Sequence, residues 1–341
     1  MKKKNDHIIK SEMRIEEYVQ FSGDVKIENI PIVKERNYFV QPIPLDGDAP
    51  KQYIKAYHYY KNCPKRLRPK TWHGYFAKFG RKSYPHESIT EYIINKLGEN
   101  LGLSINDTRL VIIKSQVRFL SKNFLKKNEK LIHGIEVLGE YFEDVEFAKE
   151  LDEDKKERRK YLTFELIEKA FKHVYPGQAH HLLKELVKLI VFDAIVGNND
   201  RHYYNWGLIG NIEKNTKSLQ FAPIYDTARG LLWNITDKKL NKMLQNFEEQ
   251  GNDQLQAFIK RSRPRISFLG NSKANHFELV GHLYHKAEYR EVIESLVNSR
   301  IRQEVLNTIE EYANLYFSEE RKKMLIILMS MRFEVLLNKT I

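Results

Sequence analysis

Gly197-Asn-Asn-Asp-Arg-His-Tyr-Tyr-Asn-Trp-Gly207 follows directly on a long, largely apolar segment of the chain. That segment, residues 178–196, forms an almost continuous wall of leucine, isoleucine, valine and phenylalanine, which predicts a central buried helix. Gly197 and the two asparagines after it suit the left-handed conformation that closes a helix. We therefore expect the polar residues that follow to form a loop at the end of this helix.

The loop carries residue types that phosphoryl transfer requires. Asp200 and Asn205 stand in the arrangement Asp-x-x-x-x-Asn, the spacing with which a kinase catalytic loop places a base and a magnesium ligand. The segment Phe221-Ala-Pro-Ile-Tyr-Asp226 delivers a further carboxylate at the end of a short strand. Mg²⁺ prefers oxygen ligands and keeps several waters, so one carboxylate and one amide suffice beside a nucleotide's phosphates. We assign Asp200, Asn205 and Asp226 to the catalytic centre, Asp200 as base and the other two as metal ligands.

The same residues also have structural interpretations. Asp and Asn are common at helix ends and in Asx-turns, so the pattern could describe a capped turn. His202 is more often a histidine that holds a loop by hydrogen bonding than a proton shuttle. Arg201 could simply pair with a carboxylate.

Lys78 is the candidate for the phosphate-binding side of the site. In the segment Tyr-Phe-Ala-Lys-Phe, residues 75–79, strand alternation places Lys78 on the opposite face from its two immediate neighbours. A kinase would use this lysine at the α- and β-phosphates, held by an acidic partner from the next helix, for which Glu91 is the candidate and Glu87 the reserve. The alternatives are an edge-strand lysine and a glutamate that only completes a helix cap.

The first half of the chain has strand-like segments around one helix. Aromatic and β-branched residues on either side of a basic, proline-flanked loop predict a β-hairpin. Ser88 and Glu91 offer a capping box at the start of the helix. The predicted elements are strands at 51–60 and 72–79, a helix at 88–101, and strands at 110–113 and 116–120.

Beyond Lys122 the pattern changes to long amphipathic stretches. The tail from Asp237 predicts several further helices, and the apolar run Met324–Met331 predicts a buried one near the C-terminus. We therefore expect an α+β, two-lobed, protein-kinase-like fold. Residues 1–122 would form a small β-rich N-lobe with one helix, and residues 123–341 a larger, mainly helical C-lobe.

Composition limits the partners and the compartment. Lys+Arg 57 against Asp+Glu 45 gives a net charge of +12, a field that favours anionic partners such as nucleotides, acidic proteins, nucleic acid or membrane headgroups. The single cysteine, Cys63, excludes an internal disulfide and a cysteine metal cluster, which fits a reducing compartment. No apolar region follows Met1-Lys-Lys-Lys4, so we expect no secretory signal. No apolar run approaches the ~20 residues of a membrane span.

A glycine-rich phosphate loop is missing from the sequence, which contains neither Gly-x-Gly-x-x-Gly nor a Walker A motif. The lysines and arginines of the loop Cys63–Lys70 would have to cover the phosphates instead. With the neighbouring tyrosines, the same loop could also form a nucleic-acid patch. Ordinary packing beside a solvated face is the commoner meaning of such a pattern.

On these motifs the chain resembles the HipA-like serine/threonine kinases, and most closely their compact, single-chain members. The segments that carry the resemblance keep their order along the chain: 75–79, 90–92 before 101–103, 195–208 and 222–226. The resemblance implies a HipA-like kinase fold and the transfer of the γ-phosphoryl group of ATP to a serine or threonine hydroxyl with Mg²⁺. It also places the adenine hinge within Phe119–Phe124.

Position by position, the resemblance implies specific roles. The expected cofactor-binding residues are Lys78, Glu91 and His202, the catalytic residues Asp200, Asn205 and Asp226, and the Mg²⁺ ligands Asn205 and Asp226. The expected partner is a protein substrate, with an antitoxin or another regulatory protein as a further candidate, and nucleic acid is not required. The expected location is the bacterial cytoplasm, with a secreted effector as the open alternative. Because the loop Cys63–Lys70 contains neither glycine nor serine, we do not expect self-inactivation by phosphorylation of that loop.

Two rival functions stay open at this point. The motif Asp200-Arg-His-x-x-Asn205 also resembles the catalytic loop of phosphoinositide kinases, but those enzymes continue to an Asp-Phe-Gly, whereas Asp226 is followed by Thr227-Ala228. A rival from another class is a catalytically inactive, nucleotide-dependent interaction module that binds nucleic acid through its positive field.

Overall fold

The structure of the protein is a computed structural model. Residues 58–60 of the first predicted strand and Cys63 lie outside the residues that it describes. It describes residues 20–43, 51–57, 65–154, 157–212, 219–251 and 253–340.

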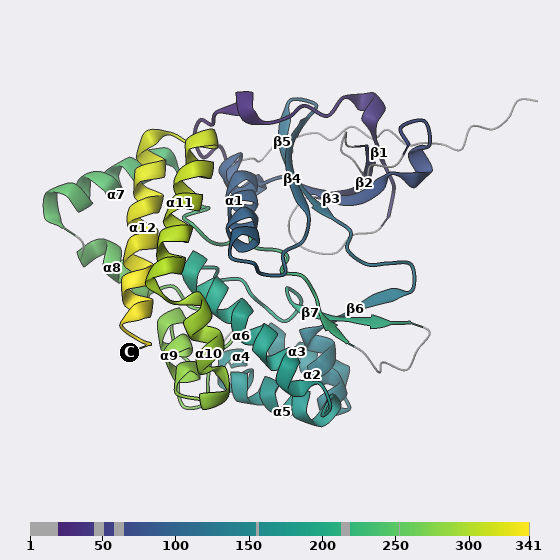
Figure 1. Ribbon diagram of the computed structural model, residues 1–341, viewed down its shortest axis with the longest axis vertical. Helices are drawn as coiled ribbons and strands as arrows, with labels where there is room; N and C mark the ends of the chain where they lie inside the picture. Colours follow the sequence, from purple (N-terminus) through teal and green to yellow (C-terminus); the bar gives the residue numbers. More distant parts are fainter. Residues whose placement is uncertain are drawn as a thin grey trace, which may run out of the picture.

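A five-stranded antiparallel sheet forms the N-terminal part, in the order β1-β2-β3-β5-β4 (Figure 1). The predicted hairpin is confirmed as β2 and β3, with Lys51 opposite Lys78 and Ala56 opposite His73. Because β3 is the middle strand, Lys78 is not an edge-strand lysine. The strands are β1 Tyr38–Val40, β2 Lys51–Ala56, β3 His73–Lys78, β4 Thr108–Ile113 and β5 Gln116–Lys122.

Alternation along β3 separates a packed face of the sheet from the face that carries the lysine. Tyr75 and Ala77 are fully buried in a small apolar cluster with Ile54. Lys78 points to the other side, where its Nζ lies 5.8 Å from the centre of the Phe119 ring on β5. Burial of the apolar face, which stabilises the sheet by about 25 cal/mol per Å² of apolar surface, thus fixes the direction of the lysine.

Helix α1, His86–Asn100, packs across the lysine side of the sheet. Its apolar stripe is fully buried in the large core that continues into the C-terminal helices. Tyr92 packs edge-on against Tyr312 and Tyr316 of α11, Ser299–Tyr316. The helix therefore belongs to the N-terminal part by sequence and shares its core with the helical part.

The predicted capping box at Ser88 is wrong. The helix already begins at His86, so Ser88 lies within its first turn, where its Oγ accepts a hydrogen bond of 3.0 Å from the Gly80 amide. Glu91 turns away from the helix start and pairs with Lys78. A buried carboxylate gains more from an ammonium than from a neutral backbone amide, so the long-range contact overrides the local motif.

Helices dominate the rest of the chain, as predicted, and a small sheet of β6 Glu129–His133, β7 Gly207–Asn211 and β8 Gln220–Phe221 lies between the two parts (Figure 1). No helix in the described part of the chain has the length and hydrophobicity to cross a membrane. The division at residues 122 and 123 stays a prediction. The remaining helices are α2 Gly134–Phe142, α3 Val145–Glu153, α4 Arg158–Tyr161, α5 Phe164–Val174, α6 Ala179–Val196, α7 Asp237–Gln250, α8 Asp253–Lys260, α9 His276–Tyr284, α10 Ala287–Leu296 and α12 Glu319–Leu337.

Helix α6 is the central buried helix that the apolar wall predicts. It ends at Gly197, whose φ of +74° is the left-handed conformation expected there. The buried Arg332 of α12 donates from Nε to the carbonyls of Ala194 and Ile195 at 3.0 Å each. This guanidinium satisfies carbonyls of the last turn that have no partner within the helix. The polar loop that follows therefore starts from a fixed point.

We expect Gly197→Ala to lower the free energy of unfolding by about 1–2 kcal/mol, because a left-handed residue with a Cβ is strained. The added Cβ would also lie 3.1 Å from Cζ of Arg332. Urea denaturation measures the loss. The matched control is Gly177→Ala, where nothing lies within 4 Å of the new Cβ, and where a change below about 0.5 kcal/mol is expected. Equal losses at both positions would contradict this account of the helix end.

Candidate active site

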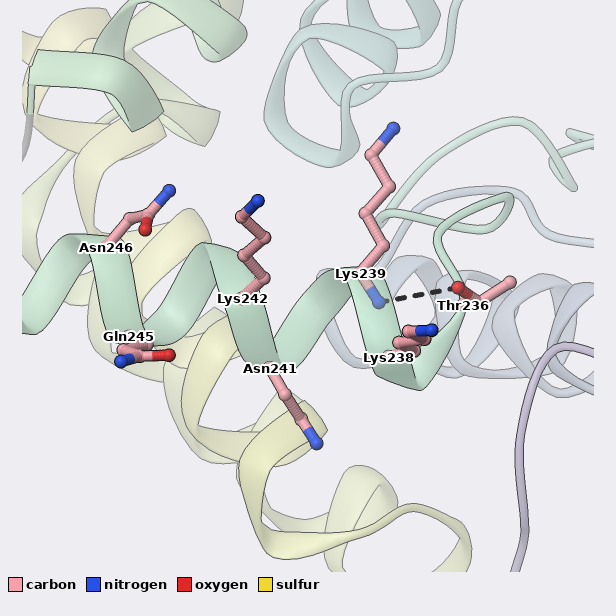
Figure 2. A pocket seen from close by; sticks show the side chains of 7 residues that line it. All are labelled: Thr236, Lys238, Lys239, Asn241, Lys242, Gln245 and Asn246. Atoms are coloured by element: carbon pink, nitrogen blue, oxygen red, sulfur yellow. Dashed lines mark hydrogen bonds between the residues drawn. The ribbon is translucent and has the colours of Figure 1, made fainter.

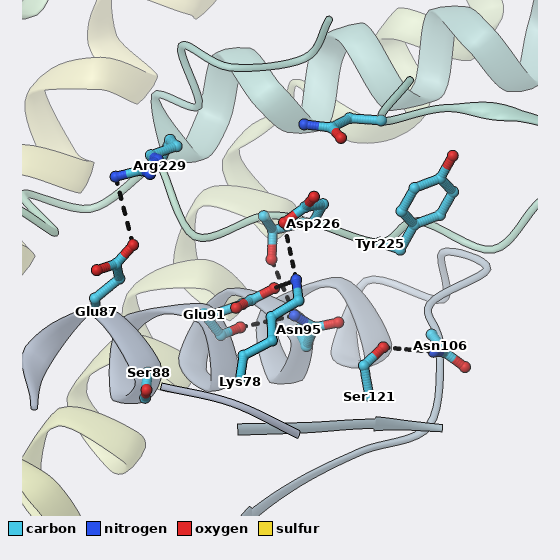
Figure 3. A network of polar contacts seen from close by, with 12 residues as sticks. Lys78, Glu87, Ser88, Glu91, Asn95, Asn106, Ser121, Tyr225, Asp226 and Arg229 are labelled. Carbon is cyan, nitrogen blue, oxygen red and sulfur yellow. Dashed lines mark hydrogen bonds and ion pairs between the residues drawn. The ribbon is translucent and has the colours of Figure 1, made fainter. Parts of the chain in front are cut away.

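Lys78 of β3 lies between two carboxylates from distant parts of the chain. Its Nζ donates to Oε1 of Glu91 at 3.0 Å and to Oδ1 of Asp226 at 2.8 Å (Figure 3). The side chain of Lys78 is 14% exposed and that of Glu91 only 4%. Because charges removed from water need partners, the two residues depend on each other. The sheet, helix α1 and the segment after β8 meet at this ammonium.

The ion pairs set the protonation states. Burial opposes the charge of Lys78, but Asp226 and Glu91 outweigh it and raise the pKa of Lys78 above its usual value. Burial also raises the pKa of Glu91, against the effect of Lys78. For Asp226 burial is again opposed by the ammonium, which wins and holds the pKa of Asp226 at about 2. Asp226 is therefore ionised at neutral pH, as a metal ligand must be.

Arg201 joins the polar loop to α6 and to the segment before Asp226. The buried guanidinium donates to both carboxylate oxygens of Asp193, at 2.8 Å from Nε and 3.0 Å from Nη2. Its Nη1 donates to the backbone carbonyls of Asn205 and Tyr225 at 2.6 Å each. The expected carboxylate partner is thus present. The same side chain also fixes the backbone beside both predicted metal ligands.

A second contact holds the residue after Asp226. Asn95 of α1 donates from Nδ2 to Oγ1 of Thr227 at 2.9 Å and to the carbonyl of Glu91 at 2.7 Å (Figure 3). Asp226 itself has a φ of +57°, a conformation that side chains other than glycine rarely adopt. Contacts on either side of the bend hold this backbone in place and turn the carboxylate toward Lys78.

Asp200 and Asn205 are linked within the loop after α6. Nδ2 of Asn205 donates to the carbonyl of Asp200 at 2.9 Å, which leaves Oδ1 as the oxygen of that amide available to a cation. Oδ1 of Asp200 accepts hydrogen bonds from Arg265, 2.7 Å from Nη2 and 3.2 Å from Nε. Its Oδ2 lies 3.8 Å from Nε of Arg229. Both carboxylate oxygens of Asp200 therefore face a guanidinium.

The pKa of Asp200 is raised, first by burial and further by the nearby carboxylate of Asp226, although His202 and Arg229 oppose the shift. A raised pKa moves a carboxylate toward the range in which a general base is most effective. Glu87, the reserve partner for Lys78, pairs with Arg229 instead at 3.4 Å.

His202 makes a loop contact, because its Nδ1 accepts from the amide of Tyr204 at 3.3 Å. Its role in cofactor binding stays a prediction. At the predicted adenine hinge, the rings of Phe124 and Tyr225 lie 5.9 Å apart, and the hinge also stays a prediction. The basic loop Cys63–Lys70 lies partly outside the described residues, so its cover of the phosphates is equally untested.

The donor set fits a magnesium ion that is bound together with a nucleotide. Among the described residues, no three histidine, cysteine or acidic side chains converge as a metal cage. The carboxylate of Asp226 and the amide oxygen of Asn205 are hard oxygen donors. Mg²⁺ typically takes one or two such groups and completes its shell with phosphate oxygens and water. These two residues could therefore hold the ion only when phosphates are present.

Sequence reasoning missed several residues of this site. Asp193 had a readable signal, since a single carboxylate inside an apolar helix wall requires a buried partner. Asn95, Arg229 and Arg265 had none, because the fold alone brings their segments to Asp200 and Asp226.

A shallow hollow on α7 lies apart from the site, and none of the predicted site residues lines it (Figure 2). The amide of Lys239 donates to Oγ1 of Thr236 at 3.4 Å and so caps the helix start. The hollow is lined by Thr236, Lys238, Lys239, Asn241, Lys242, Gln245 and Asn246. Lysines and amides on one helix face form an ordinary solvated surface.

A central-strand lysine paired with a glutamate of the following helix, opposite an Asp-x-x-x-x-Asn loop and a further aspartate, defines a protein of the kinase-like class. The family model of the HipA-like C-terminal domain matches residues 44–304. This match covers more than half of the 341 residues, and the chain belongs to the HipA-like kinase family.

The chain is also a distant relative of the serine/threonine-protein kinase CtkA of Helicobacter pylori. The two are 25% identical over 187 residues, a match that covers 51% of this chain and 52% of CtkA. The match thus spans about half the length of the curated relative.

A solved structure confirms the predicted α+β fold. The crystal structure of the Helicobacter pylori proinflammatory kinase CtkA superposes with a TM-score of 0.64 at 20% identity and covers 84% of this chain and 94% of that one. The HipA–HipB–operator DNA complex of Shewanella oneidensis matches with a TM-score of 0.48 at 13% identity, covering 88% of this chain and 67% of that one. This second likeness is too low to carry an argument about an antitoxin or DNA.

We expect Arg201→Met to lower the free energy of unfolding by about 3–5 kcal/mol, because it leaves Asp193 as an unpaired buried charge. The double variant Arg201→Met/Asp193→Leu should regain most of this stability, since no lone charge remains. In the double variant the backbone carbonyls of Asn205 and Tyr225 still lack Nη1 of Arg201 as their donor. Hydrogen exchange in residues 198–206 should therefore stay faster than in the wild type. Urea unfolding and exchange mass spectrometry measure the two effects. A double variant as unstable as the single one would refute the argument.

Proposed function

We propose that this chain is an ATP- and Mg²⁺-dependent kinase that phosphorylates serine or threonine hydroxyls of proteins. The observation that carries the proposal is the ammonium of Lys78 between Glu91 and Asp226. In protein kinases, the ion pair between the β3 lysine and the glutamate of the following helix must be in place for transfer. Here the same two elements supply the pair at 3.0 Å.

Each residue has a defined role in the proposed reaction. Lys78 donates to the α- and β-phosphates of ATP, and Glu91 keeps the ammonium in position. Asn205 and Asp226 hold Mg²⁺, which neutralises phosphate charge when it is bound. Asp200 orients the acceptor hydroxyl and takes its proton while the hydroxyl oxygen bonds to the γ-phosphorus and the bond to ADP breaks.

Two further considerations support a protein hydroxyl as the acceptor. The chain belongs to the HipA-like kinase family, and its relative CtkA is named a serine/threonine-protein kinase. A cytoplasmic location and a regulatory partner remain predictions from the family resemblance.

We expect Asp200→Asn and Asp226→Asn each to lower the rate of transfer at least ~100-fold, because they remove the base and a metal ligand. The assay offers radiolabelled ATP with a mixture of dephosphorylated proteins and, in parallel, with phosphoinositide vesicles. Circular dichroism checks that both variants are folded. The control is Asp253→Asn, which removes an exposed carboxylate at the start of α8 and should keep full activity. Exclusive labelling of lipid, or full activity of Asp200→Asn, would overturn the proposal.

The pH dependence of transfer should report Asp200. The base must be ionised, so kcat/KM should fall as the pH drops through the raised pKa of Asp200, which lies above the ordinary value of 3.8. Asp226, with its pKa at about 2, stays ionised over this range and does not contribute. The measurement is kcat/KM between about pH 3 and 8, with circular dichroism at each pH to exclude unfolding. An acid limb at or below 3.8 would contradict the assignment.

A further inference from the structure

The side chain of Arg265 is hydrogen-bonded to a carboxylate oxygen of Asp200, the base of the proposed reaction. Nη2 and Nε of Arg265 both bond to Oδ1 of Asp200, at 2.7 and 3.2 Å, and Arg229 lies 3.8 Å from the other oxygen. An acceptor hydroxyl that donates to Oδ1 must replace a hydrogen bond from Arg265, whereas Oδ2 has only the longer ion pair with Arg229. Arg265 makes the closer contact, so its displacement frees Oδ1 for the acceptor.

The backbone around Arg265 is fixed while its head group can move. On one side, Oγ of Ser262 donates to Oδ1 of Asn199 at 2.7 Å. On the other, the carbonyl of the fully buried Ser267 accepts from the amide of Phe164 at 2.8 Å. Between these anchors, the side chain of Arg265 is 33% exposed. A rotation of the side chain can therefore free Oδ1 of Asp200 without unfolding the segment.

The surroundings of Arg265 are positive. The segment between Lys260 and Asn275 contains lysines and arginines but no aspartate or glutamate. Arg261 and Arg263 are exposed on it. A further cation lies against the segment, because Nη2 of Arg159 donates to the carbonyl of Ala274 at 2.7 Å. Such a surface next to the base attracts negative groups.

We propose that Arg265 is a specificity residue that selects acidic acceptor peptides, in which carboxylates flank the hydroxyl. This inference rests on the proposed kinase function and adds a substrate class to it. An acidic acceptor lets the guanidinium exchange the carboxylate of Asp200 for a carboxylate of the peptide, so no charged hydrogen bond is lost. A neutral acceptor that donates to Oδ1 displaces Arg265 and offers it no replacement partner. Charge-assisted hydrogen bonds of this kind are strong enough to make the difference about tenfold.

The test compares two peptides with one serine each, flanked on both sides by two glutamates or by two glutamines. We expect the wild type to show a kcat/KM about tenfold higher for the acidic peptide. In Arg265→Ala the value for the neutral peptide should rise, because the base is uncovered, and the ratio should fall toward one. Arg265→Lys should keep most of the preference. The control Lys242→Ala removes a positive charge from the exposed face of α7 (Figure 2) and should leave the ratio unchanged.

Two outcomes would overturn the inference: a wild type without preference, or an Arg265→Ala variant in which both peptides lose activity equally, as expected of a merely structural residue. If the wild type phosphorylates neither the peptides nor the protein mixture, the proposed function fails, and binding decides the inference separately. Fluorescence anisotropy of the same peptides with alanine for serine should show tighter binding of the acidic one, lost in Arg265→Ala. At physiological salt, equal binding of the acidic peptide by the wild type and by Arg265→Ala would reject the role of Arg265.

Discussion

The ammonium of Lys78 connects three separate elements of the chain at one point. The central strand supplies the lysine, α1 supplies Glu91, and the bend after β8 supplies Asp226. Each carboxylate offsets the cost of burying the ammonium, and the ammonium offsets the cost of burying Glu91. Removing Lys78 would leave two carboxylates without their shared counter-charge, so the ammonium ties the sheet to α1 and to the bend after β8.

Two buried arginines hold the polar loop after α6 in place through hydrogen bonds. Arg332 caps the end of α6, and Arg201 ties the loop to Asp193 and to the backbone of Asn205 and Tyr225. Buried guanidinium groups are poor stabilisers in comparison with apolar side chains, but their fixed fork of donors specifies geometry. The loop can therefore be polar and irregular while its residues keep defined positions.

The sequence predicted most of the fold, because its signals are local. The apolar wall before Gly197 and the alternation around Lys78 each depend on a few neighbouring residues. The capping box at Ser88 failed because Glu91 has a stronger partner across the sheet. Arg229 and Arg265 could not be predicted, since their approach to Asp200 depends on how α7 to α9 fold back against the loop. The sequence thus identifies groups that could do chemistry, whereas their neighbours depend on long-range packing.

The shared core of α1 and α11 couples the ion pair between Glu91 and Lys78 to the position of the C-terminal helices. In Figure 1, α11 runs beside α1 and α12 lies on the other side of α11, and Tyr92 packs against two tyrosines of α11. Any outward swing of α1 that withdrew Glu91 from Lys78 would have to pull these rings apart or carry α11 along. A molecule that binds the surface of the C-terminal helices could thus move Glu91 away from Lys78 without contacting either residue.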